Sequence, residues 1–267
     1  MKKIILLTLM PLLLLACNNG EQAATNGTQT TPADGIQALS AGDSIVSRID
    51  EERIYCYIKA EAPDPQLAKV MGEWIDDELG GDYPGDPADL QAIVSFYGKA
   101  IADTLRKEAK DCYDPTMAME YEATIEKVFE TDKVVTYALN TYMHIGGAHP
   151  SSRGLGVTFR KSDGRRLDWN IVRSYCQYEL TEMIKERLKD YFGVSTEEEF
   201  ENCLTGIETY NLPLPQTPPY FLENGIAFIY QQYEITAYAY GMPNDVIPYD
   251  SIRPMLSGWA KQLIEGL

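Results

Sequence analysis

The sequence contains two histidines, His144 and His149, five residues apart. Together with Asp163 and Asp168 they could begin a metal site, but zinc takes three or four ligands and the usual histidine spacings are absent. His149 stands in a Gly-Gly-Ala-His-Pro segment, whose glycines permit positive φ or a close backbone approach. We expect it to fix this loop by a hydrogen bond to a carbonyl. Ligand binding and a metal or catalytic role are the alternatives, and we predict no metal ligand.

The other common sequence patterns of catalytic sites do not identify a reaction. The chain has 40 acidic residues, so a pair of carboxylates at glycosidase spacing carries no information. The patterns G-x-S-x-G, H-E-x-x-H and the P-loop are absent. A hydrolase using a serine and His149 remains an alternative, but no feature requires it. The sequence therefore favours a protein without catalytic residues or a cofactor, and leaves catalysis undecided.

Tyrosine is unusually frequent, with 18 residues. Tyr233, Tyr238 and Tyr240 cluster beside Glu234 near the C-terminus. Exposed tyrosines with a carboxylate can stack on sugar rings or hold a basic protein. The competing interpretation is that they lie on half-buried strands, which tyrosine favours. We take these four residues and His149 as ligand-binding candidates.

The first 17 residues read as an export signal. Lys2 and Lys3 precede an apolar stretch of twelve residues, too short for the roughly 20 of a transmembrane helix. The stretch ends in Leu-Leu-Ala followed by Cys17, which resembles the lipobox of bacterial lipoproteins. The resemblance implies cleavage before Cys17 and attachment of lipid to its thiol, against the alternative of an ordinary signal peptide. We expect a signal peptide over residues 1–16 and a lipidated, flexible tether over residues 17–42, poor in bulky apolar residues.

Four further cysteines lie in the body of the chain. In an exported protein they permit two disulfides with three pairings. Cys176 and Cys203 flank a predicted helical pair, which would leave Cys56 with Cys112. The alternative is four buried free thiols.

Helices and strands alternate along the rest of the chain. Strands are expected at 53–58, 119–128 and 134–143, and hairpins around Ser162-Asp163-Gly164 and Asn224-Gly225. Helices are expected at 67–79, from Pro87 to Leu105, at 178–191 and at 251–263, with a capping box from Ser195 to Glu198 opening a short one. Without a repeated β-α-β pattern, these elements predict an α+β fold in which helices pack on antiparallel sheets, with two subdomains as an option.

Three stretches of the second half resemble a known family. They are YMHIGGAHP (142–150), SDGRRLDW (162–169) and FLENGIAFIYQQYEITAYAYG (221–241), the last followed by Val-Ile-Pro-Tyr. Together they resemble the domain of unknown function that ends RsiV-type lysozyme-sensing anti-sigma factors and accompanies PdaC-type peptidoglycan deacetylases. The resemblance implies a module at 131–267 that binds a protein or a glycan, after a strand–helix module at 43–130. Ala237 stands where the family often has proline, and neither the sigma-binding segment nor the deacetylase domain is expected here.

The net charge of the chain indicates which kinds of partner it can bind. Lysine and arginine total 23 against 40 acidic residues, which gives −17, and removing Lys2 and Lys3 with the signal peptide leaves −19. Such a chain repels nucleic acid and attracts basic proteins. We therefore expect an exported protein, held by lipid on Cys17 to an envelope membrane, that binds a basic protein, for which lysozyme is a candidate, or an envelope glycan. A hydrolase or accessory module acting on envelope polysaccharide is the alternative.

Overall fold

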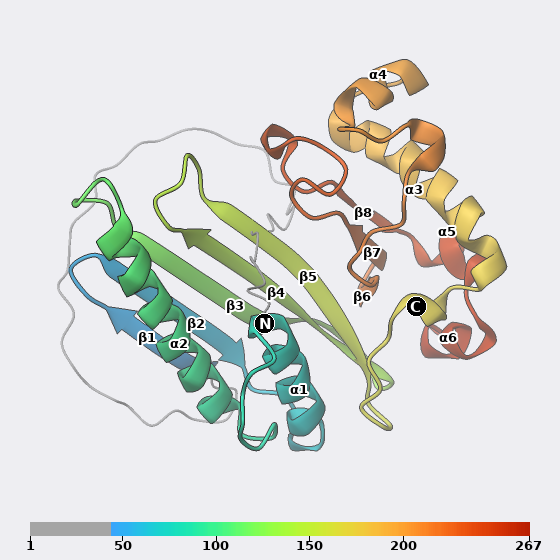
Figure 1. Ribbon diagram of the computed structural model, residues 1–267. Helices are drawn as coiled ribbons and strands as arrows, with labels where there is room; N and C mark the ends of the chain where they lie inside the picture. Colours follow the sequence, from blue (N-terminus) through green and yellow to red (C-terminus); the bar gives the residue numbers. More distant parts are fainter. Residues whose placement is uncertain (1–43) are drawn as a thin grey trace, which may run out of the picture.

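The computed structural model describes residues 44–267, which form an α+β fold with two sheets (Figure 1). The strands are β1 (Ser44–Asp50), β2 (Ile54–Glu61), β3 (Met119–Glu130), β4 (Val134–His144), β5 (Ser151–Arg160), β6 (Tyr220–Leu222), β7 (Gly225–Ile229) and β8 (Asn244–Ile247). The helices are α1 (Ala68–Leu79), α2 (Leu90–Asp111), α3 (Gln177–Phe192), α4 (Glu197–Cys203), α5 (Tyr249–Ile252) and α6 (Gly258–Leu263).

The larger sheet has the strand order β1-β2-β3-β4-β5. Its strands are antiparallel to their neighbours except at the centre, where β2 and β3 run parallel and Ile54 lies opposite Met119. A parallel pair needs a crossover connection, which α1 and α2 supply. The predicted α+β fold is confirmed, and the larger sheet is mixed, with this one parallel pair among antiparallel ones.

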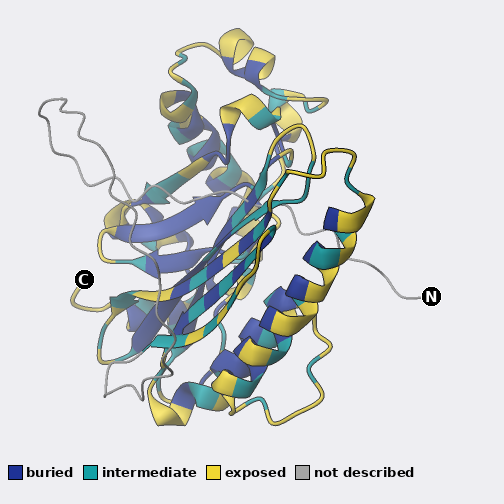
Figure 2. Ribbon diagram, turned by 90° about the vertical axis from the view of Figure 1, so that its left-hand side faces the viewer, coloured by how far each residue is buried: buried dark blue, intermediate teal, exposed yellow. Residues whose placement is uncertain are grey.

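Helices α1 and α2 cover one face of this sheet. Asp89 caps α2 by accepting a hydrogen bond from the backbone N–H of Ala92, so the helix begins after Pro87 rather than at it. The apolar side of both helices packs on the alternate residues of β2 to β5 that point toward them, while their other side is exposed (Figure 2). The members of this core include Ile58, Ile93 and Phe159, each completely buried.

The second unit is built around the small antiparallel sheet β6-β7-β8. Its core joins α3, α4, α5 and α6 to this sheet through residues such as Phe200, Phe228 and Ile252. Two local details differ from the sequence-based expectation. The capping box is formed by Thr196 and Glu199, one residue later than predicted, and the predicted C-terminal helix is broken into α5 and α6 around Pro254.

The second unit docks on the sheet face that α1 and α2 leave free, over β4 and β5. The backbone N–H of Phe221 in β6 donates to the Thr158 hydroxyl at 2.8 Å. Beside it the Tyr220 ring lies so close to β5 that a Cβ on Gly156 would stand 2.4 Å from the ring. Glycine is therefore the residue that permits this contact. The large sheet continues to Arg160, the end of β5. The module boundary predicted at residue 130 therefore falls inside this sheet, between its adjacent strands β3 and β4.

All four cysteines of the described residues are free thiols, rather than the two disulfides held as one alternative. Cys56 and Cys176 are buried in the first and second cores, and Cys203 is the buried last residue of α4. Cys112 lies next to Gly146, where a Cβ would stand 3.1 Å from its sulfur. Cys56 instead faces the Gly98 carbonyl, so these two thiols have different neighbours.

Candidate functional site

The loop between β4 and β5 meets the tyrosine-rich segment that follows β7. The His149 ring stacks on Tyr238, with centroids 3.8 Å apart and planes at 27°. Its Nε2 lies 3.1 Å from the Tyr233 hydroxyl, and its Nδ1 lies 2.8 Å from the carbonyl oxygen of Pro150. We call His149, Tyr233 and Tyr238 the His149 cluster. His149 does contact a carbonyl, as expected. The residue is exposed, however, so this hydrogen bond contributes little to the stability of the fold.

Tyr233 has a backbone conformation that costs energy. Its φ is +63°, and among residues 44–267 no other non-glycine residue has a positive φ. The left-handed region costs an L-residue about 1–2 kcal/mol. The side chain is nevertheless 57% exposed, so the conformation is not the result of burying the ring. Strain of this kind is found where a side chain must be presented in a fixed direction.

Glu234 holds this conformation in place. Its carboxylate accepts hydrogen bonds from the backbone N–H groups of Gln231 and Gln216, each at 2.7 Å. Burial raises the pKa of this carboxyl, and the two N–H donors act to lower it. Both of its oxygens are therefore engaged within the protein. Glu234 supports the loop that presents Tyr233, which differs from the direct ligand contact predicted for it.

Two glutamines attach the same loop to the outer edge of β5. The Gln231 side chain donates to the carbonyl oxygen of Gly154 at 2.7 Å and accepts from the N–H of Gly154 at 3.3 Å. The Gln232 side chain accepts from the N–H of Ser152 at 3.0 Å. These bonds satisfy backbone groups that an edge strand would otherwise expose. The His149 cluster therefore rests on a fixed edge of the sheet.

Tyr240 lies apart from this cluster. Its ring packs edge-on against Phe192 at the end of α3, with centroids 5.3 Å apart, and its carbonyl oxygen accepts a hydrogen bond from Tyr191 at 2.7 Å. Tyr240 belongs to the packing of the second unit. The structure thus brings together Tyr233, Tyr238, Glu234 and His149 from the predicted set and separates Tyr240 from them.

The face of the large sheet opposite α1 and α2 adjoins the His149 cluster. Across three strands, Tyr57 lies opposite Glu122, which lies opposite Tyr142, and the next row runs from Tyr55 through Glu120 to His144. We call these six residues the aromatic–acidic face. Tyr55 and Tyr57 stack with centroids 6.4 Å apart, and Glu122 is exposed. Among the described residues, neither Glu120 nor Glu122 forms an ion pair.

The environment of two tyrosines of this face, Tyr142 and Tyr55, favours the neutral phenol. Partial burial and then the neighbouring Glu120, Tyr238 and Glu122 raise the pKa of the Tyr142 phenol. Burial, followed by Glu122, likewise raises the pKa of Tyr55, against a smaller opposing effect of Arg48. Tyr142 lies opposite Ser152 of β5, whose N–H donates to Gln232, the residue before Tyr233, so the His149 cluster and the aromatic–acidic face are neighbours. The phenols are therefore hydrogen-bond donors beside carboxylate acceptors.

The sequence analysis did not identify Tyr55, Tyr57, Glu120, Glu122 and Tyr142 as site residues. The alternation of β3 placed its glutamates on one face, but their partners depend on strand order and register. The available signal was a pair of tyrosines two positions apart in β2, Tyr55 and Tyr57.

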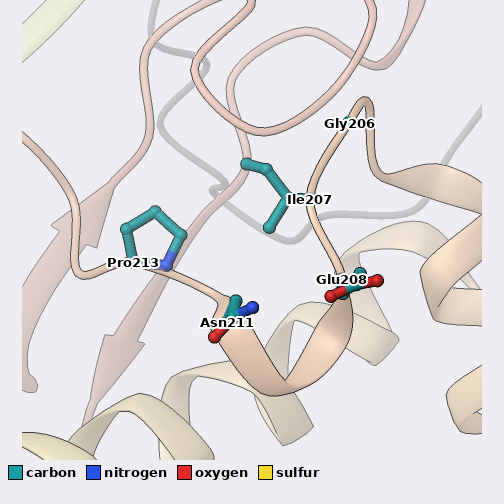
Figure 3. Close-up of a pocket in the computed structure, with 5 residues that line it drawn as sticks. All are labelled: Gly206, Ile207, Glu208, Asn211 and Pro213. Atoms are coloured by element: carbon teal, nitrogen blue, oxygen red, sulfur yellow. The ribbon is translucent and has the colours of Figure 1, made fainter.

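The other candidate sites in the structure have fewer side chains suited to binding or catalysis. Within residues 44–267 no three His, Cys, Asp or Glu side chains gather as metal ligands would. A shallow pocket lies in the second unit, lined by Gly206, Ile207, Glu208, Asn211 and Pro213 (Figure 3). Glu208 is its single titratable lining residue, and this carboxylate accepts a hydrogen bond from Tyr210. Cys17 lies outside the described residues, and no helix from Ser44 onward has the length and apolar character to cross a bilayer.

Replacing Tyr233 with glycine tests whether its backbone is strained. Glycine adopts positive φ freely, so Tyr233→Gly should leave the free energy of unfolding unchanged or raise it by up to about 1 kcal/mol. Tyr210→Gly is the matched control, because Tyr210 is also exposed but has an ordinary φ. Thermal unfolding of both variants makes the comparison. A larger loss of stability in Tyr233→Gly than in the control contradicts the interpretation.

Comparison with known proteins finds a family match for part of the chain. Residues 171–250 match the DUF3298 family model, described as a protein of unknown function. The crystal structure of a DUF3298 family member from Bacteroides fragilis is similar over 84% of this chain and 96% of that chain, with a TM-score of 0.64 and 19% identity. One from Pseudomonas aeruginosa covers 82% of this chain and 94% of that one, with a TM-score of 0.57 and 13% identity. At these identities the likeness establishes a shared fold. No curated protein matches the sequence.

Proposed function

We propose that this protein is a lipid-anchored, non-enzymatic binding module of the cell envelope that holds a basic protein on its aromatic–acidic face. The observation that supports it is the row formed by Tyr57, Glu122 and Tyr142, which lies beside the exposed His149 cluster. The lipid anchor is proposed from the sequence around Cys17. Lysozyme is the candidate partner that the family resemblance suggests.

The composition of this face suits such a partner. Tyrosine provides a large, rigid contact area with a polar end, and it is enriched at the energetic centres of interfaces. The unpaired carboxylates of Glu120 and Glu122 supply acceptors for lysine or arginine, and the net charge of −17 speeds the encounter. The strained Tyr233 adds a side chain fixed in direction before the partner arrives, which reduces the entropy lost on binding.

Titration with lysozyme at two salt concentrations tests the proposal. Charge attraction alone is screened, so binding that depends only on it should vanish between about 50 mM and about 500 mM salt. A packed aromatic contact should leave measurable binding at the higher concentration. Calorimetry on residues 43–267 gives both values. Binding lost at high salt would indicate nonspecific attraction, and binding absent at both would exclude lysozyme.

A charge reversal tests the location of the contact. Glu122→Lys should weaken binding by about tenfold, or about 1.4 kcal/mol, because a repulsive charge replaces an acceptor at the centre of the face. Glu108→Lys makes the same change of charge on α2, on the other side of the sheet, and also removes no ion pair. Equal weakening in the two variants would show that only net charge matters. If lysozyme fails but a peptidoglycan fragment binds, and Tyr142→Ala abolishes this, the face binds glycan instead.

A further inference from the structure

A basic segment of this acidic chain lies at one end of the molecule. Residues 160–173 contain five basic and two acidic side chains, whereas the whole chain carries −17. This segment follows β5 and runs beside the C-terminal helices. Neither the aromatic–acidic face nor the DUF3298 likeness accounts for such a concentration of positive charge.

Aromatic rings accompany these charges. The guanidinium group of Arg165 lies 4.9 Å from the centroid of the Trp259 ring, and that of Arg160 lies 5.9 Å from it. The Arg173 guanidinium lies 4.9 Å from the Tyr175 ring, which is 75% exposed. Backbone hydrogen bonds from Arg173 to Met255 and from Ser257 to Ile171 hold the two segments together. We call Arg165, Trp259, Arg173 and Tyr175 the basic strip.

Among residues 44–267, the two arginines of the basic strip form no ion pair. Arg160 pairs with Asp163, Lys161 with Glu130, and Arg166 with Asp77 at 2.5 Å. Within the described part of the chain, Arg165 and Arg173 have no ion pair, and Arg165 is exposed. Arg173 donates to the Pro254 carbonyl oxygen, and the backbone N–H of Arg165 donates to Asp163. Two guanidinium charges without an ion pair in this part of the chain therefore lie beside a tryptophan and an exposed tyrosine.

The chain enters the folded body at this same end of the sheet. Ser44, the first residue of β1, pairs with Glu61, the last residue of β2. Strand β2 is parallel to β3, whose last residue, Glu130, leads into the turn beside Lys161. Lys133 in that turn donates to the Gln262 carbonyl oxygen of α6 at 2.6 Å. Figure 1 shows α6 near the end of the large sheet toward which β2 points. Residues 1–43, with Cys17, therefore connect to the body on the side that carries the basic strip.

We propose that the basic strip rests on the anionic lipid headgroups of the membrane to which the protein is anchored. Arginine and lysine are attracted to anionic headgroups, and tryptophan and tyrosine favour the interface between water and hydrocarbon. Contact at this end turns the opposite end of the sheet, with the rows from Tyr55 and Tyr57, away from the bilayer. The proposal rests on the lipid anchor proposed above but is independent of the ligand.

Fluorescence quenching by brominated lipids tests it with the full lipidated chain. The protein is reconstituted into vesicles of phosphatidylcholine alone or mixed with phosphatidylglycerol, with the same content of brominated lipid. We expect quenching of tryptophan to be at least about twofold greater with phosphatidylglycerol. The chain has three tryptophans, of which Trp74 is buried in the first core and Trp169 packs against Phe228 in the second. Trp259→Phe should therefore remove most of this difference, and Trp169→Phe should leave most of it in place.

Charge reversals provide the matched comparison. Arg165→Glu with Arg173→Glu should reduce quenching to the level in phosphatidylcholine. Lys107→Glu with Lys110→Glu changes the charge equally near the end of α2, where Arg106 pairs with Glu51 at the far end of the sheet, and should change nothing. Equal quenching in both lipids, or an equal effect of both double variants, overturns the proposal. A chain that does not enter vesicles overturns the anchor as well, so the two failures are distinguishable.

Discussion

Phe159→Ala should lower the free energy of unfolding by about 3–5 kcal/mol. Phe159 is completely buried in β5, where it contacts the edge of Trp74 from α1 at 6.3 Å and of Tyr137 from β4 at 6.4 Å between ring centroids. Removing the ring leaves a cavity between the sheet and the helix layer, and close-packed neighbours fill such a cavity only in part. Urea unfolding followed by circular dichroism measures the change.

Tyr113→Ala is the control for this experiment, because Tyr113 is fully exposed between α2 and β3. It should change the free energy of unfolding by no more than about 0.5 kcal/mol. A loss below about 1 kcal/mol for Phe159→Ala would mean that the site collapses around the missing ring or that the helix layer contributes little to stability.

Cys17→Ser should move the protein from the membrane to the aqueous fraction. Serine lacks the thiol that accepts the lipid, and each buried methylene contributes about 0.8 kcal/mol to membrane affinity, so losing several acyl chains removes the anchor. Partitioning between detergent and aqueous phases measures the effect. Cys112→Ser is the matched control, because Cys112 is a half-buried thiol within the folded body. If Cys17→Ser partitions as the wild type does, the lipoprotein prediction is wrong.

The sequence predicted the elements that depend on local pattern. The alternation at 119–128 became β3, whose inward residues include Tyr121 and Ile125. The helical spacing at 67–79 became α1, and Asn224-Gly225 became the turn between β6 and β7. Each of these signals depends on the period of apolar residues or on turn chemistry, which neighbouring residues determine.

Features set by distant contacts were harder to predict. The parallel pairing of β2 with β3 depends on where α1 and α2 pack, and no local pattern records it. The capping box moved by one residue because Ser195 and Thr196 both have a glutamate three positions later, at Glu198 and Glu199. Pro254 was expected within the first turn of a continuous helix, but the chain turns there to bond with Ile171 and Arg173.

The candidate site was predicted only in part, because it too depends on contacts between residues distant in sequence. Tyr233, Tyr238 and Glu234 are close in sequence, so their proximity followed directly. The contact of Tyr233 with His149 joins residues 84 positions apart, and it required the fold. The row of Tyr57, Glu122 and Tyr142 required the register of three strands.

The crossover between β2 and β3 also determines when the large sheet can assemble as the chain is synthesised. The hairpin of β1 and β2, with α1 and α2, is complete before β3 exists, but β2 then lacks the neighbour that lies opposite Ile54 to Ala60. Until residues 119–125 arrive, one strand with a buried apolar side and an open hydrogen-bonding edge is exposed to other chains. Pairings between such distant residues form slowly, and unpaired strands promote aggregation. A chaperone would therefore have the most to protect while only the residues before β3 have been made.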